Sequence, residues 1–122
     1  MKTLLVDDSA TMRRIERNIL ESLKIMDIEE AVDGADAFEK ISSGNYDLVL
    51  LDWNMPKMDG FSFLKTVRAM DKFKSIKIIM VTSESEKTRI LDAIKAGANH
   101  YIVKPFTAEI LMAKLRELKM EV

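Results

Sequence analysis

Five short apolar runs of strand length alternate along the chain with stretches in which apolar residues recur every three or four positions. The expected strands cover residues 3–7, 28–32, 48–52, 77–82 and 101–104. Three of these runs are almost continuously apolar, which is typical of parallel strands that are covered by helices on both faces. The alternation therefore predicts an α/β fold of three layers, in which right-handed crossovers join the strands of a parallel sheet.

Each expected helix carries one apolar stripe, because its apolar residues are spaced three or four positions apart. In chain order the stripes are Met12, Ile15, Ile19 and Leu23; Ala37, Phe38 and Ile41; Phe61, Leu64 and Val67; Ile90, Leu91 and Ile94; and Leu111, Leu115 and Leu118. We expect each stripe to face the sheet. Arg13 and Arg14 are expected to lie on the solvated face of the first helix.

Composition narrows the classes of protein. The chain has 122 residues, the size of one ordinary domain, so a single domain over residues 1–122 is expected. A net charge of -1 gives no general attraction to nucleic acid or to membranes. The sequence has no cysteine, which excludes disulfide bonds and thiolate metal sites.

No apolar run approaches the ~20 residues needed to span a bilayer, and the first residues do not resemble a signal peptide. The expected location is the cytosol.

Acidic and polar side chains stand where several expected strands end. Asp7 and Asp8 lie at the end of the first strand, Asp52 ends the third, Thr82 ends the fourth and Lys104 ends the fifth. The carboxyl ends of parallel strands open into one crevice, where ligands usually bind in open α/β sheets. Three carboxylates without a nearby histidine or cysteine form a site for a hard cation, and Mg²⁺ is the best fit. The carboxylates should also repel one another, which should raise the pKa of at least one of them.

Each of these residues also has a simpler explanation. An Asp at the end of a strand often caps the next helix, which is a sufficient role for Asp7 or Asp8 taken alone. Thr82 suits an ordinary strand position, and Lys104 alone would be a solvated lysine. The presence of all of them at the same edge of one sheet favours a functional site.

Four motifs, VDDSATMRRI, LDWNMPKMDG, VTSE and YIVKPF, resemble the receiver domain of bacterial two-component response regulators. The resemblance covers essentially the whole chain, and it is specific because all four motifs occur in order at these separations. It implies a flavodoxin-like fold, in which five helices surround a five-stranded parallel sheet of order 2-1-3-4-5. That strand order is the known order of the family, so it is taken from the resemblance and not from the apolar pattern.

The resemblance implies that Asp52 accepts a phosphoryl group from a histidine kinase and forms an aspartyl phosphate. Lys104 would pair with the phosphoryl oxygens as a point charge, and the Thr82 hydroxyl would donate a hydrogen bond to one of them. Pro105 indicates a turn, and in the family the peptide bond before it is cis. The domain would help to catalyse its own phosphorylation and dephosphorylation, but its role would be that of a signalling switch rather than an enzyme.

The same resemblance implies a Mg²⁺ site at these residues. Asp8, Asp52 and the backbone carbonyl of Asn54 would bind the ion directly, Asp7 would act largely through water, and further waters would complete an octahedron. The ion would remove the repulsion among the carboxylates.

Within the family the likeness is to the stand-alone chemotaxis regulators. It implies a chemotaxis-type histidine kinase, the flagellar motor switch protein as the target, and a phosphatase as a further candidate partner. Thr82 and Tyr101 would form the switch. The positions that match the target-binding surface are Lys87, Ile90, Ala98, Tyr101, Val103, Phe106 and Lys114. Ser9 and Glu117 depart from the pattern of those regulators. These departures affect which partner is expected but not the expected phosphorylation chemistry. A monomer is expected, with no nucleic acid partner and no membrane insertion.

Two other classes of function are compatible with the sequence. The chain would also suit a phosphorelay intermediate or the receiver module of another two-component pathway, although it has no basic recognition helix for DNA. A flavin-binding or metal-dependent hydrolase domain could share the fold. The acidic loop DDSAT is unsuited to a flavin phosphate, and turnover of phosphomonoesters would distinguish a phosphatase from a switch.

Overall fold

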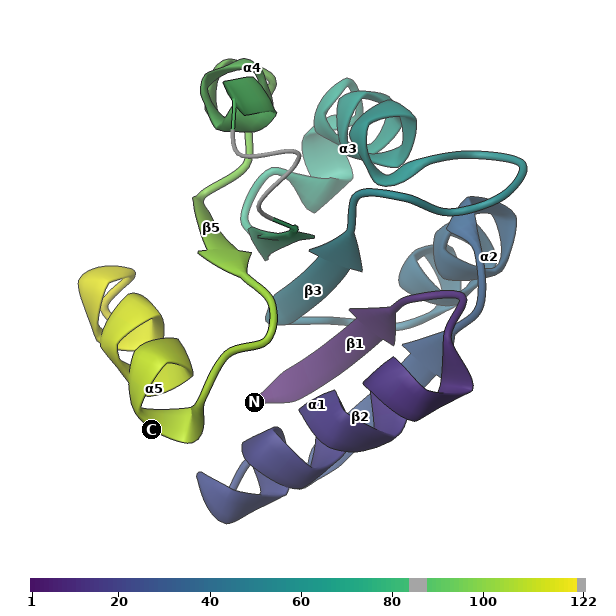
Figure 1. The fold of residues 1–122 in the computed structure, drawn as a ribbon. Coiled ribbons are helices and arrows are strands. Elements are labelled where there is room, and N and C mark those ends of the chain that lie inside the picture. The colour runs from purple at the N-terminus through teal and green to yellow at the C-terminus, as the bar shows by residue number, and fades with distance from the viewer. Residues whose placement is uncertain (84–87, 121–122) are drawn as a thin grey trace.

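The computed structural model describes residues 1–83 and 88–120 of the protein (Figure 1). Its strands are β1 (Lys2–Val6), β2 (Asp27–Ala31), β3 (Leu48–Asp52), β4 (Lys77–Thr82) and β5 (His100–Val103). Its helices are α1 (Ala10–Ser22), α2 (Gly34–Ser43), α3 (Gly60–Arg68), α4 (Ile90–Lys95) and α5 (Ala108–Glu117), with one 3-10 turn, η1 (Asp71–Phe73). Strands and helices alternate through these residues, as the apolar pattern predicts. None of the helices described is long and apolar enough to cross a membrane.

The five strands form one parallel sheet of order β2-β1-β3-β4-β5, which confirms the predicted fold class and strand order. β3 lies at the centre, and all of its residues are buried. β3 and β4 have the predicted bounds, whereas β1, β2 and β5 each begin and end one residue earlier than expected. Asp7 and Lys104 therefore lie just beyond β1 and β5. Their backbone amides still donate hydrogen bonds to the carbonyls of Ala31 and Thr82 on the neighbouring strands, which holds both residues against the sheet.

Helices cover both faces of the sheet, and each face has its own apolar core. α1 and α5 lie on one face, where Leu20 and Leu111 pack with sheet residues that include Leu50 (Figure 1). α2, α3 and α4 lie on the other face, where the buried helix residues are Ala37, Ile41, Phe63, Leu64, Val67 and Ala93. Successive residues of a strand point to opposite faces. The side chain of Asp52, two residues after Leu50, therefore projects toward α1 and α5, and Trp53 belongs to the opposite core.

Four of the helices described begin at a side-chain cap. Ser9, Asp33, Asp59 and Thr107 each accept a hydrogen bond from the backbone amide three residues later, which satisfies a donor that the helix itself cannot pair. Ser9, one of the two departures from the chemotaxis regulators, therefore has a local structural role as the start of α1.

Two of the predicted apolar stripes are wrong in detail. In α1 the buried residues are Glu16 and Leu20, whereas Ile15 is 44% exposed. The apolar spacing does not include Glu16, because this residue is charged. The predicted stripe therefore lies partly on a face of α1 that does not contact the sheet. In α4 the buried residue is Ala93, and Leu91 is 63% exposed. α4 is short and lies beside the edge strand β5, so it has little sheet surface to cover.

Candidate functional site

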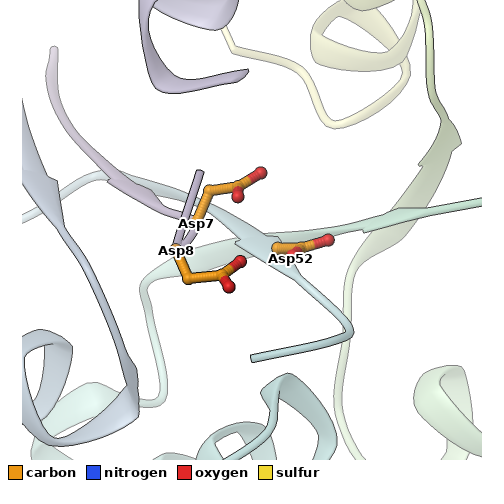
Figure 2. Close-up of side chains that lie close together, drawn as sticks. All are labelled: Asp7, Asp8 and Asp52. Carbon is orange, nitrogen blue, oxygen red and sulfur yellow. The ribbon is translucent and has the colours of Figure 1, made fainter. Parts of the chain in front are cut away.

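Three carboxylates meet at the carboxyl end of the sheet, as the sequence predicts. Asp7 follows β1, Asp8 is the next residue, and Asp52 ends β3, which is the neighbour of β1 in the sheet (Figure 2). One carboxylate oxygen from each residue lies within 4.8 Å of the others. Asp7 and Asp52 are 1% and 4% exposed, whereas Asp8 is open to solvent. The cluster thus consists of two buried acids and one exposed acid.

The Lys104 ammonium lies against this cluster. Its Nζ donates a hydrogen bond of 2.9 Å to Oδ1 of Asp52 and lies 3.9 Å from Oδ2 of Asp7. The peptide bond between Lys104 and Pro105 is cis, as the resemblance implies. Thr82, the last residue of β4, is fully buried, and its hydroxyl has no hydrogen-bond partner among the residues described. The sheet therefore brings a cation and an unpaired hydroxyl to the same end as the acids.

Burial dominates the electrostatics of the cluster. It raises the pKa of Asp52 to about 6, even though the hydrogen bond from Lys104 favours the ionised form, and the charge of Asp7 acts in the same direction as burial. Burial also raises the pKa of Asp7, against the effect of the Ser9 backbone amide. Burial alone would lower the pKa of Lys104, but the hydrogen bond to Asp52 and the negative charges of Asp52 and Asp7 together outweigh burial and raise the pKa. The predicted rise in carboxylate pKa is confirmed, although its main cause is burial rather than repulsion among the acids.

The donor set fits a hard divalent cation. The clustered ligand atoms are carboxylate oxygens, which Mg²⁺ prefers over nitrogen or sulfur. Oδ2 of Asp7 is buried and has no hydrogen-bond partner among the described residues, and a cation could satisfy it directly or through water. Asn54 lies on the exposed side of the loop that follows β3, two residues after Asp52. The residues present are therefore compatible with the expected Mg²⁺ site.

Close backbone packing fixes the loop that follows Asp52. The amide of Gly60, the first residue of α3, donates a hydrogen bond of 2.9 Å to the carbonyl of Trp53. A Cβ atom at position 60 would overlap the carbonyl oxygen of Asp52, so glycine is required there. The Trp53 ring is 1% exposed, stacks on Phe61 with 5.4 Å between ring centroids, and lies 4.5 Å from the Arg89 guanidinium. The backbone of Asp52 is thus fixed by the strand pairing of β3 before it and by the packed Trp53 side chain after it.

Two residues of α1 lie near the acidic cluster, although the sequence pattern did not predict a role for them there. Arg13 donates hydrogen bonds to the carbonyl of Asp7 at 2.7 Å and to Glu30 on β2 at 2.8 Å. The prediction of a solvated face is wrong for Arg13, because its side chain reaches back over the end of β1. Glu16 is 2% exposed, and burial, followed by the charge of Asp7, raises its pKa to about 8. Its position four residues before Leu20, within the buried stripe of α1, was the signal that could have revealed it.

Apart from Thr82 on β4, the described residues that were named for the switch and the partner surface lie around α4, β5 and α5 but differ in exposure. Those that are partly exposed are Ile90, Tyr101, Val103 and Lys114. Those that are buried are Ala98 and Phe106. Lys87 lies outside the described residues. The Lys114 ammonium lies 4.6 Å from the centroid of the Tyr101 ring. The carboxylate of Glu117, the second departure from the chemotaxis regulators, contacts Nε2 of His100.

The chain matches known proteins in both sequence and fold. Residues 3–116 match the response regulator receiver domain family. The chain is 45% identical over 118 residues to the chemotaxis protein CheY of Pseudomonas aeruginosa, with 97% of this chain and 95% of that protein covered. It is 51% identical over 116 residues to the chemotaxis protein CheY1 of Helicobacter pylori, with 94% of each covered. The solved structure of the chemotaxis response regulator CheY4 of Vibrio cholerae has a TM-score of 0.86 at 34% identity and covers 96% of this chain and 97% of that one. The motifs, the strand order and these matches agree, and the chain belongs to the family of response regulator receiver domains.

Proposed function

We propose that this protein is a cytosolic, single-domain response regulator that a histidine kinase phosphorylates on Asp52 in a Mg²⁺-dependent reaction. Phosphorylation would switch it to bind a target, and the flagellar motor switch protein is the target that we favour. The observation that carries the proposal is the position of Asp52, which clusters with Asp7 and Asp8 and accepts a hydrogen bond of 2.9 Å from Lys104. Relatives named as chemotaxis proteins match nearly the whole chain, which supports a role in chemotaxis.

Asp52 is placed to act as the nucleophile. A pKa of about 6 leaves its carboxylate ionised at neutral pH. The carboxylate would attack the phosphorus of a phosphohistidine, and the new P–O bond would form as the P–N bond breaks and the imidazole leaves with its electron pair. Phosphoryl transfer depends mainly on positioning and charge neutralisation. Lys104 already contacts Asp52 and can follow the phosphoryl oxygens, and the buried Thr82 hydroxyl is able to donate a hydrogen bond to one of them.

The Mg²⁺ ion would be held by Asp8, Asp52 and the backbone carbonyl of Asn54, with Asp7 acting through water. When bound, the ion would neutralise negative charge on the carboxylates and on the phosphoryl oxygens. Asp8 is exposed, and an exposed carboxylate suits an ion that keeps several of its waters.

The switch would connect Thr82 with the partly exposed residues of β5 and α5. Tyr101 pairs with Met80 in the ladder between β4 and β5, and Thr82 lies two residues after Met80, so all three side chains lie on the same face of the sheet. A Thr82 hydroxyl that turns toward a phosphoryl group would leave space for the half-buried Tyr101 ring to move inward. The ring would then leave Lys114 and change the surface that a partner contacts. Phosphate would in this way bias a two-state element through a local charge.

Intact mass spectrometry tests the assignment of the phosphorylation site. Wild type incubated with Mg²⁺ and acetyl phosphate should gain the mass of one phosphoryl group, and Asp52→Asn should gain none. Asp8→Ala should require more Mg²⁺ for the same labelling, whereas Asp92→Asn, which removes an exposed acid on α4, should behave like wild type. Full labelling of Asp52→Asn would refute the assignment, and continuous turnover of added phosphomonoesters would indicate a phosphatase.

A further inference from the structure

Glu16 is a buried acid that the chemistry proposed above does not use. It lies on the face of α1 that packs on the sheet, four residues before Leu20, and is 2% exposed. Its Oε2 atom is buried and has no hydrogen-bond partner among the described residues. Burial of an unpaired carboxyl group is unfavourable, and an aliphatic side chain would suit this position in an apolar stripe. An unsatisfied group of this kind calls for an explanation.

The charged groups that act on Glu16 all belong to the phosphorylation site. In order of influence they are Asp7, Lys104 and Asp52. α5 packs against α1, and its residues in this core, Leu111 and Leu115, carry no charge. On α1 itself, Arg13 and Arg17 are hydrogen-bonded to an acid on β2. Lys104 is hydrogen-bonded to Asp52, whose side chain projects toward the side of the sheet that α1 covers, and the buried face of α1 carries Glu16. The geometry and the charges therefore both identify Lys104 as the cation of the site that acts on Glu16.

Lys104 has hydrogen-bond donors to spare for a further partner. Its ammonium carries three N–H groups, and one of them donates to Asp52. The distance of 3.9 Å to Asp7 is an ion-pair distance but is too long for a hydrogen bond. When a phosphoryl group forms on Asp52, the ammonium has to turn from the carboxylate toward the phosphoryl oxygens. The buried oxygens near this site that lack a hydrogen-bond donor, among the residues described, include Oδ2 of Asp7 and Oε2 of Glu16.

We propose that Glu16 is a positioning residue for Lys104, which offers the ammonium an acceptor on the α1 side of the crevice and keeps it aligned while the phosphoryl group is transferred. This inference rests on the proposed role of Asp52 as the phosphoacceptor. Oε2 of Glu16 makes no hydrogen bond in the resting structure, so the contact forms when Lys104 turns, either directly or through a water molecule.

The ionisation of Glu16 is compatible with this role. Because burial raises its pKa to about 8, the group is a neutral acid at pH 7, and its carbonyl oxygen accepts a hydrogen bond without adding a fourth negative charge to the site. Above about pH 8 the group ionises, and its charge opposes the arrival of an anionic phosphodonor. Glutamine reproduces the neutral form and keeps the acceptor. Leucine removes the acceptor and keeps the apolar packing.

The rate of phosphorylation by acetyl phosphate at saturating Mg²⁺ tests the proposal, with intact mass as the readout. Glu16→Leu should be slower by about tenfold, which corresponds to the loss of one charge-assisted hydrogen bond. Glu16→Gln should remain within about threefold of wild type at pH 7, and it should keep its rate above pH 8, where wild type slows. Glu39→Leu, which removes an exposed acid on α2, should match wild type. Thermal unfolding of Glu16→Leu should show a fold at least as stable as that of wild type.

A double-mutant cycle shows whether Glu16 acts through Lys104. In a Lys104→Ala background, the change Glu16→Leu should cause no further loss of rate. The proposal is overturned if Glu16→Leu reacts as fast as wild type, if Glu16→Gln is as slow as Glu16→Leu, or if the loss persists without Lys104. Absence of labelling in wild type would instead refute the proposed function of Asp52, so the two failures are distinguishable.

Discussion

Replacement of Asp52 by asparagine should stabilise the metal-free protein, and the gain should appear only as the pH rises. Burial raises the pKa of Asp52 to about 6 in the folded protein, from an ordinary value of 3.8. An acid with a raised pKa in the folded state holds its proton more tightly there, so its ionisation costs stability. The cost is absent below about pH 4 and complete above about pH 6. At about 1.4 kcal/mol for each pH unit, the difference corresponds to about 3 kcal/mol.

Urea unfolding in the presence of EDTA, followed through the emission of Trp53, measures this difference. Across pH 4 to 8, the free energy of unfolding of Asp52→Asn should separate from that of wild type by about 3 kcal/mol between about pH 4 and pH 6, and should stay separate above. Asp92→Asn should follow wild type at every pH. Added Mg²⁺ should narrow the gap, because the ion binds and stabilises the folded wild type. A difference between Asp52→Asn and wild type that stays constant with pH would show that ionisation of the buried carboxylate is not the cause.

The emission of Trp53 should also titrate with Mg²⁺, because its ring directly follows Asp52 and is the sole indole of the chain. Asp8→Ala should require much more metal, and identical titrations would place the ion elsewhere. Thr82→Ala should still accept phosphate on Asp52 but should lose most of the gain in affinity for a flagellar motor switch peptide that beryllofluoride produces in wild type. An unchanged gain in Thr82→Ala would contradict the coupling, and no binding by activated wild type would favour a phosphorelay role.

The fold and the direct members of the acidic site could be predicted because both depend on local patterns. Apolar runs of strand length predict the parallel sheet, and a parallel sheet places the carboxyl ends of its strands along one edge. Asp7, Asp52 and Lys104 stand at those ends, so their convergence follows once the strand order is given, without knowledge of any side-chain contact. The strand order itself came from the resemblance, and the role of Asp52 as phosphoacceptor stays a prediction until it is tested.

The parts that could not be predicted depend on how helices rotate and on how far long side chains reach. Glu16 was passed over because a charged residue is normally assigned to the solvated face, and only the packing of α1 shows that it faces the sheet. Arg13 was misassigned because its side chain bends toward the end of β1 and β2. The contact between Arg89 and Trp53 joins residues that are far apart in the sequence, and no spacing rule connects them.

The glycine at the start of α3 has a consequence for how freely this sequence can vary. Position 60 contributes no side chain and no chemistry, yet any Cβ atom there would displace the Asp52 carbonyl. In a saturation library selected for phosphorylation, we expect position 60 to tolerate as few replacements as the nucleophile itself, whereas the exposed Lys57 in the same loop, which already has a φ of 68°, should accept glycine, asparagine and unbranched polar residues. Random mutation should therefore change the middle of this loop far more often than position 60. Descendants of such a chain would keep glycine there, because the space beside the Asp52 carbonyl cannot hold a Cβ atom.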